Sequence, residues 1–206
     1  MKKVCVTGLS ALVCWNGAQV LAQQVSPAEA TGAALVRAMP ESKNSREGPA
    51  LDVPSGAAPL LIEFDDEAMW GNKRIDPTMQ CARNGGDKPA SPKFRVRSVP
   101  VGASSLVVYV LNEPPSWDNH GLFRVRPQAN QSADASTWVV PAISNNRDTA
   151  KLPQRITLYA GGNSWGKAYS SPCPSGGSWR YTISVYALDA NDGVIGYGKT
   201  VMGFAP

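Results

Sequence analysis

The sequence predicts a mainly β protein, and three observations carry that prediction. Residues 179–189 (WRYTISVYALD) alternate between two sides of an extended chain, which is the period of a half-buried strand. Residues 102–110 (GASSLVVYV) form the most apolar strand-like stretch of the chain. The 17 prolines and 19 glycines favour many turns over long helices. A chain of 206 residues is long enough for one β domain plus a tail.

The first 22 residues read as an export signal. Lys2 and Lys3 precede a mostly apolar run, and Ala22 supplies a small residue for cleavage. Such a signal removes residues 1–22, and no later apolar run reaches the ~20 residues that a membrane helix needs. We therefore expect a soluble mature chain, periplasmic or secreted from a bacterium, without a transmembrane segment.

Residues 23–59 read as a flexible tail in front of the β domain. One short helix is expected over residues 26–39, because Ser26 can cap its start and Pro40 ends it. The rest of the tail is rich in Pro, Gly, Ser and charge, which is typical of a linker. The β domain is expected over residues 60–206.

Five more stretches read as strands by their apolar alternation or β-branched content. They are residues 60–64 (LLIEF), 94–97 (FRVR), 123–126 (FRVR), 155–160 (RITLYA) and 194–204 (VIGYGKTVMGF). Three acidic residues, 65–67, follow the first of them. A cation site needs ligands that converge from several loops, so a solvated turn is the preferred interpretation.

The sequence FRVR occurs twice, at residues 94–97 and 123–126. In a strand, each copy places Phe and Val on one face and two arginines on the other. If both strands lie in one sheet, four guanidinium groups share a basic face that suits carboxylates or phosphates. The alternative is a solvated sheet face. The four residues of this predicted basic face are Arg95, Arg97, Arg124 and Arg126.

Two cysteines remain after the signal is removed, because Cys5 and Cys14 leave with it. Two cysteines in an exported chain usually pair, so a Cys81–Cys173 disulfide is expected. It would close a loop of about 92 residues, which the chain-entropy model values at about 4–5 kcal/mol. The alternative is two free buried thiols.

Residues 169–189 (YSSPCPSGGSWRYTISVYALD) resemble the phosphatidylethanolamine-binding protein family, which includes the Raf kinase inhibitor-like proteins of bacteria. That family shows Y-x-G-P-C-P-P-x-G-x-H-R-Y and then a strand that ends Y-A-L-D. Residues 75–92 match its Ile, Cys and Ser-Pro positions, residues 102–110 match the next strand, and residues 111–115 (LNEPP) stand at its D-P-D-x-P block. The resemblance implies an antiparallel β-sandwich. Family members usually place one or two helices before the final strand, but residues 190–193 leave no room for them.

The resemblance also implies a small pocket that accepts an anionic, often phosphate-like group. Glu113, Pro172 and Tyr181 keep the family's character, together with the Pro-Cys-Pro loop. Leu111 and Trp179 stand where the family has an acid and an imidazole, and Leu122 stands at its other imidazole. Losing such groups weakens recognition of a polar ligand, so a degenerate anion pocket is expected. Its residues are Leu111, Glu113, Leu122, Pro172, Trp179 and Tyr181.

Little in the sequence supports catalysis. His120 is the one histidine, so a two-histidine metal site is impossible and a hydrolase would have to use His120. No Gly-rich phosphate loop lies between a strand and a helix. We expect no enzyme activity, no cofactor and no metal. The formal charge of +4, of which Lys2 and Lys3 leave with the signal, is too small to indicate nucleic acid.

The sequence therefore predicts an exported binding or interaction module, acting as an accessory part of a bacterial envelope or secretion assembly. Its expected partner is another envelope protein, and a small anionic ligand is a further possibility. The alternative is a periplasmic carrier of a small phosphate-bearing or amphiphilic ligand.

Overall fold

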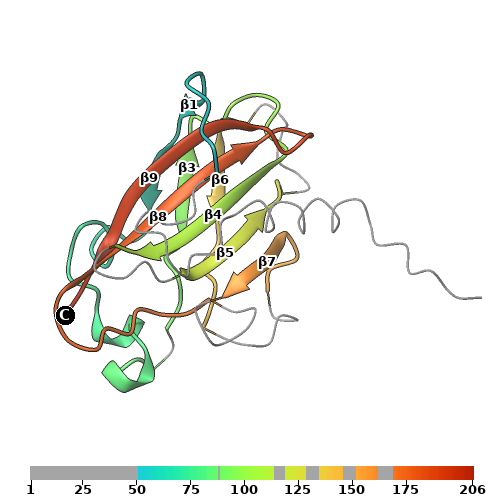
Figure 1. Cartoon of the computed structure of the whole chain (residues 1–206). Coiled ribbons are helices and arrows are strands. Elements are labelled where there is room, and N and C mark those ends of the chain that lie inside the picture. The colour runs from blue at the N-terminus through green and yellow to red at the C-terminus, as the bar shows by residue number, and fades with distance from the viewer. Residues whose placement is uncertain (1–50, 88, 114–118, 129–134, 146–151, 162–168) are drawn as a thin grey trace, which may run out of the picture.

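The computed structural model describes residues 51–87, 89–113, 119–128, 135–145, 152–161 and 169–206. The export signal, the helix expected over residues 26–39 and Pro115 lie outside these residues. The described strands form a six-stranded and a three-stranded sheet, and Figure 1 shows β3 and β6 of the small sheet behind β4 and β8 of the large one.

The six-stranded sheet has the order β1 (Ala58–Pro59), β9 (Val194–Ala205), β8 (Trp179–Leu188), β4 (Ser105–Asn112), β5 (Asn119–Val125) and β7 (Ile156–Gly161). The three-stranded sheet has the order β2 (Leu61–Phe64), β3 (Phe94–Arg97) and β6 (Thr137–Val140). All neighbouring pairs are antiparallel except β1 with β9. The only helical elements among the described residues are two single 3-10 turns, η1 (Pro77–Met79) and η2 (Ala82–Asn84).

The main core lies between the two sheets. Phe94 and Val96 on β3 belong to the same buried cluster as Val108 on β4 and Ile183 and Val185 on β8. Two apolar sheet faces that meet in this way define a β-sandwich. The predicted mainly β sandwich is confirmed. The described stretch between β8 and β9 is a turn, without the helices that family members usually place before the final strand.

Strand β8 is buried on both faces rather than half-buried as the alternation predicts. Tyr181 and Ile183 face the main core, whereas Tyr186 and Leu188 belong to a second cluster on the other face of the six-stranded sheet. The intervening Thr182 and Ser184 are also buried. The reason is position: β8 lies between β9 and β4, and a central strand is shielded by neighbours that its own sequence does not reveal.

This second cluster, here called the outer cluster, lies on the sheet face that points away from the sandwich core. Its members come from β4, β5 and β8. They are Val107, Tyr109, Leu111, Leu122, Tyr186 and Leu188.

The first strand of the large sheet is β1, which pairs with β9 at residues 58–59, and Leu60 N donates to Tyr197 O. Residues 65–67 form the expected turn: Asp66 Oδ1 accepts hydrogen bonds from the backbone N of Ala68 and of Met69. The described residues contain no group of three or more side chains placed to hold a metal. They also contain no helix with the length and apolarity to cross a membrane.

Residues 137–140, which look like a short insert in a polar stretch, form the edge strand β6. Trp138 and Val140 are buried in the main core. Trp138 Nε1 donates to Ala135 O at 3.1 Å, so the indole is buried with its polar atom satisfied. The pairing of β6 with β3 supplies the backbone partners that this short segment lacks by itself.

Candidate functional site

The segment around Ile75 docks on strand β9. Ile75 N donates to Phe204 O at 2.7 Å, and Phe204 N donates to Lys73 O at 2.8 Å. A Cβ on Gly203 would lie 2.6 Å from Ile75 Cγ1 and 2.8 Å from Lys73 O, so only glycine allows this approach. The docked segment pairs with one edge of β9 through Arg74 and Phe204, and β8 pairs with the other edge of β9.

The predicted disulfide is confirmed. Cys81 and Cys173 are bonded, with their Cα atoms 5.1 Å apart. Cys81 N also donates to Pro172 O at 2.8 Å, and Arg83 Nη2 donates to Cys173 O at 3.2 Å. Asn84 Nδ2 donates to a third carbonyl of the loop, that of Pro174. Arg83 Nη2 donates to Pro174 O as well, at 3.4 Å, so one covalent bond and four hydrogen bonds fix this loop to the 3-10 turns.

Beyond these anchors the loop reaches solvent. Residues 175–178 are all exposed. Trp179 closes the loop, because its Nε1 donates to Gly176 O at 2.8 Å while its ring packs against the main core. Residues 175–178 are called the anchored loop below. It is a short exposed segment whose two ends are held, which is an arrangement that proteins use for recognition.

A polar cluster lies at the end of the six-stranded sheet where β8 and β5 begin and β4 ends. The rings of His120 and Tyr181 meet edge to face with centroids 5.0 Å apart. Asn112 is the register partner of Tyr181, and Tyr169 packs over Gly121. These four residues, Asn112, His120, Tyr169 and Tyr181, are called the polar cluster, and none is more than 8% exposed.

The hydrogen bonds of His120 fix its orientation. Ser170 N donates to His120 O at 2.7 Å, and His120 Nδ1 lies 2.9 Å from Ser170 O. A carbonyl oxygen only accepts, so Nδ1 carries the proton in this contact. Beside it, burial and the neighbouring Tyr181 raise the pKa of the Tyr169 phenol, which is therefore neutral and a hydrogen-bond donor at physiological pH.

Three of the six residues predicted to line a pocket lie on the opposite face of the six-stranded sheet from Tyr181. Leu111 and Leu122 belong to the outer cluster. The carboxylate of Glu113 pairs with Lys199 Nζ at 2.9 Å and Arg180 Nε at 3.3 Å. Lys199 is the register partner of Ser184, and Ser184 is the register partner of Tyr109, which lies on the outer face. Residues two apart on a strand share a face, so Leu111 and Glu113 point away from Tyr181 together.

The structure does bring Pro172, Trp179 and Tyr181 to one end of the sandwich, together with two residues that the sequence analysis did not assign to the pocket, Asn112 and His120. Asn112 could have been found from strand alternation, because it lies between Leu111 and Glu113 and therefore points to the opposite face of the sheet. His120 could not, because a register shift at Val110 and Leu111 changes its alignment, and bulges leave little trace in a short sequence.

The four arginines of the predicted basic face do not share a face, so that prediction is wrong. Arg95 and Arg97 lie on β3 of the three-stranded sheet, where they pair with Asp65 at 3.1 Å and Glu63 at 2.6 Å. Arg124 lies on β5 of the six-stranded sheet. Its buried guanidinium pairs with Asp192 at 2.6 Å.

Arg126 follows the end of β5 and is exposed. Its backbone N donates to Arg155 O at 2.9 Å. The premise of one common sheet fails because β3 and β5 pair with different partners.

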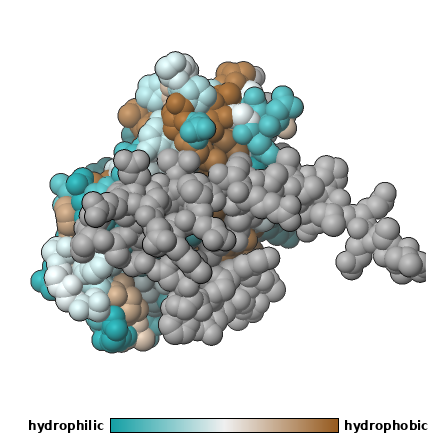
Figure 2. Space-filling view, in the orientation of Figure 1, coloured by the Kyte–Doolittle hydropathy of each residue, from teal (hydrophilic) through white to brown (hydrophobic). Residues whose placement is uncertain are grey.

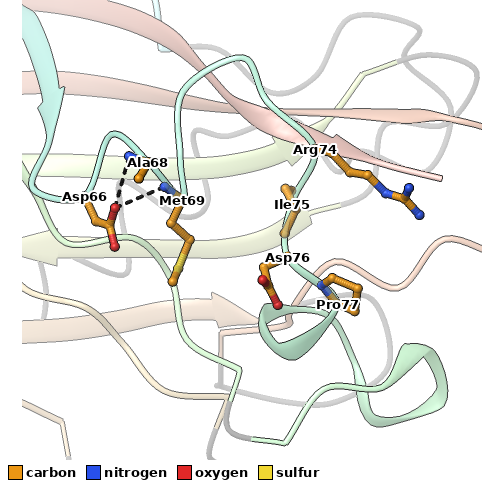
Figure 3. A pocket seen from close by; sticks show the side chains of 7 residues that line it. All are labelled: Asp66, Ala68, Met69, Arg74, Ile75, Asp76 and Pro77. Atoms are coloured by element: carbon orange, nitrogen blue, oxygen red, sulfur yellow. Dashed lines mark hydrogen bonds between the residues drawn. The ribbon is translucent and has the colours of Figure 1, made fainter.

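A separate hollow of about 550 Å³ lies between residues 66–69 and 74–77 (Figure 3). Its two carboxylates serve local turns: Asp66 accepts from two backbone N–H groups, and Asp76 accepts from Thr78 N and Thr78 Oγ1. The Thr78 hydrogen bonds lower the pKa of Asp76. Figure 3 shows the Arg74 guanidinium directed away from Asp66, so these charges do not converge on one point.

Comparisons with known proteins agree with the architecture. The family model described as phosphatidylethanolamine-binding protein matches residues 66–204. The solved structure of YbcL from E. coli, described as a member of the mammalian PEBP family, is similar with a TM-score of 0.51 and 16% identity, over 71% of this chain and 97% of that one.

A PEBP homologue from Chlamydia trachomatis is similar with a TM-score of 0.49 and 22% identity, over 73% of this chain and 97% of that one. A comparison with curated proteins found no match. The family match spans most of the described sandwich, including the disulfide, the anchored loop and the polar cluster. The chain therefore belongs to the phosphatidylethanolamine-binding protein family.

Proposed function

We propose that this chain is an exported, non-enzymatic binding protein that recognises another envelope protein through its anchored loop. The observation that carries the proposal is the loop itself. Residues 175–178 are exposed, while the Cys81–Cys173 bond and the Trp179–Gly176 hydrogen bond hold both ends. A loop ordered before binding loses little conformational entropy on binding.

Two further observations support recognition at the protein surface. The polar cluster is closed off from solvent, since Tyr181 and His120 are buried and in ring contact. Arg180, which follows Trp179, is exposed beside the loop, and arginine is enriched in protein interfaces. The disulfide fits an oxidising compartment such as the periplasm or the extracellular space. An accessory role in an envelope or secretion assembly is consistent with these features.

The test uses the full mature chain as bait in its own envelope extract. Ser175→Arg and Ser178→Arg place bulky charged side chains on the anchored loop, and Asn191→Arg makes the same change on the exposed turn at the other end of β8. We expect the partner captured by the wild type to be retained by Asn191→Arg and reduced at least tenfold by the loop variants, with unchanged melting temperatures. A partner lost equally from all three variants, or from none, contradicts the proposal.

The carrier of a small phosphate-bearing or amphiphilic ligand is the second candidate, and one observation favours it. The Tyr169 hydroxyl is fully buried and has no hydrogen-bond partner among the described residues. A buried donor without a partner is costly, and a ligand acceptor would satisfy it. The polar cluster also supplies Asn112 and His120 on the same side of the sheet.

Intrinsic tryptophan fluorescence distinguishes the two candidates, because Trp179 lies two residues before Tyr181 on β8, on the same side of that strand. Titration of the mature chain with short-chain phospholipids and inorganic phosphate should leave the emission unchanged if the anchored loop is the binding surface. A saturable change that Tyr169→Phe weakens at least tenfold would support the carrier instead. Tyr169→Phe is the matched variant, because it removes only the hydroxyl and keeps the buried ring.

A further inference from the structure

The outer face of the six-stranded sheet is apolar and buried. The six residues of the outer cluster are 0–5% exposed and extend across β5, β4 and β8. Arg124 on β5 is buried on the same face, since it is the register partner of Val107. An apolar sheet face is stable only beneath another layer of the protein, so this side of the sandwich has a cover.

Only part of this cover belongs to the described residues. Leu51, Val194 and Tyr197 pack against the outer cluster. The backbone of Leu51 also forms a hydrogen bond with the Tyr186 hydroxyl, and the ring centroids of Tyr186 and Tyr197 lie 5.0 Å apart. These contacts lie at the β8 and β9 side. Within the described ranges, no other apolar side chain packs on this cluster.

The length of chain outside the described ranges indicates where the cover comes from. The internal segments between them, 114–118, 129–134, 146–151 and 162–168, have five to seven residues, and each must join two fixed ends. The N-terminal segment is much longer, even after an export signal is removed. It enters the described structure at Leu51, which already lies on this face.

The sequence before Leu51 suits an apolar sheet. In the helix expected over residues 26–39, Leu35 and Met39 lie one above the other on one face, while Ala30 and Ala33 lie on the opposite face. Residues 40–50 connect this helix to Leu51, and eleven extended residues span at most about 36 Å. The connection is long enough to place the helix over β4 and β5.

We propose that residues 26–39 form a helix that docks on the outer cluster through Leu35 and Met39 and supplies the second layer over β4 and β5. This segment then belongs to the folded domain, and only residues 40–50 act as a connection. The inference goes beyond the proposed binding function, because it concerns the face opposite the polar cluster and holds whatever the anchored loop binds.

Photo-crosslinking in the full mature chain tests the docking directly. A benzoyl-phenylalanine is placed at Leu35, or at Ala33 as the matched position on the opposite helix face. We expect Leu35 to give intramolecular crosslinks to peptides that contain β4, β5 or β8, at several times the yield from Ala33. Crosslinks between two molecules would assign the cover to a second copy, and crosslinks confined to residues 23–50, or absent, would equally overturn the proposal.

Charge substitutions give an independent readout. Leu35→Asp with Met39→Asp puts two carboxylates against the outer cluster, whereas Ala30→Asp with Ala33→Asp adds the same charge on the opposite helix face. We expect the first pair to raise the fluorescence of a hydrophobic dye several-fold and the second pair to leave it near the wild-type level. Equal dye fluorescence in the two double variants contradicts the docking, even if both unfold, because the face of the helix would then not matter.

Discussion

The two FRVR segments have the same four residues and different surroundings. In β3, Arg95 and Arg97 are 46% and 52% exposed and form ion pairs at the surface of the three-stranded sheet. In β5, the side chain of Arg124 is 6% exposed and is held by Asp192. Phe94 and Phe123 are fully buried in the same core cluster. The apolar positions of the repeat thus behave alike, and the charged positions do not.

This difference separates local from non-local information. Alternation places Phe and Val on one side of either strand, and a sandwich has one core for that side to face. The other side faces whatever the neighbouring segments provide. For β3 this is solvent with nearby Glu63 and Asp65, whereas for β5 it is the outer face, where Asp192 from the β8–β9 turn reaches the guanidinium.

The largest expected effect tests the similarity between the repeats. Phe94→Ala and Phe123→Ala each remove a buried ring from the main core, which costs about 3–5 kcal/mol of unfolding free energy. Urea unfolding of the oxidised mature chain should show similar losses for the two variants. A loss below about 1 kcal/mol in either one would mean that the two apolar positions are not equivalent.

The next largest expected effect tests the difference between the charged positions of the two FRVR segments. Arg124→Met leaves the Asp192 carboxylate partly buried without its partner, and such a change costs about 3 kcal/mol. The double variant Arg124→Met with Asp192→Asn should recover part of that loss, since asparagine tolerates the positive φ of 63° at this position. The same urea measurement applies. No recovery in the double variant would contradict the pairing as the cause.

Arg95→Ala and Arg97→Ala should have much smaller effects. Both side chains are about half exposed, and surface ion pairs contribute about 0–1 kcal/mol. The expected loss is below about 1 kcal/mol for each variant and should shrink further in 1 M salt, because the Debye length falls to about 3 Å. A loss equal to that of Arg124→Met, undiminished by salt, would remove the contrast between the repeats.

The smallest expected effect is the pH dependence of the stability that Asp65 contributes beside the first FRVR segment. The hydrogen bond from Lys93, together with the charges of Arg95 and Lys93, lowers the pKa of Asp65. Its contribution to stability is therefore complete above the unfolded-state pKa of about 3.9 and is lost as pH falls through the lower folded-state pKa. The difference in unfolding free energy between the wild type and Asp65→Asn, followed from about pH 6 to about pH 2, should shrink toward acid. A difference that grows toward acid would contradict the lowered folded-state pKa of Asp65.

Much of the fold could be predicted because it depends on patterns within one segment. The alternation of residues 179–189 predicts β8 and sends Tyr181 and Ile183 to the same face. The count of cysteines predicts the Cys81–Cys173 bond. The 137–140 strand was missed, since four residues next to polar loops carry too little pattern until β3 pairs with them.

The candidate site was predicted less well, and the reason is geometric. Leu111 and Leu122 were assigned to the pocket by their places in a motif, but a motif position does not specify a sheet face. The register shift at Val110 and Leu111 places His120 beside Tyr181 and leaves Leu122 in the outer cluster. Of the four residues in the polar cluster, only Tyr181 was assigned to a pocket from the motif.

By itself, the amino-acid sequence determined most of the longer strands, which of their side chains are apolar partners, and which two cysteines were available to bond. The tertiary structure decided which sheet each strand joins, that β8 is buried on both faces, and that Arg124 is enclosed while Arg95 is solvated. The physical reason is that these interactions act over different separations along the chain. Alternation acts between neighbours in the chain, whereas burial and charge pairing depend on segments as distant as Arg124 and Asp192, which meet only when the sandwich is assembled.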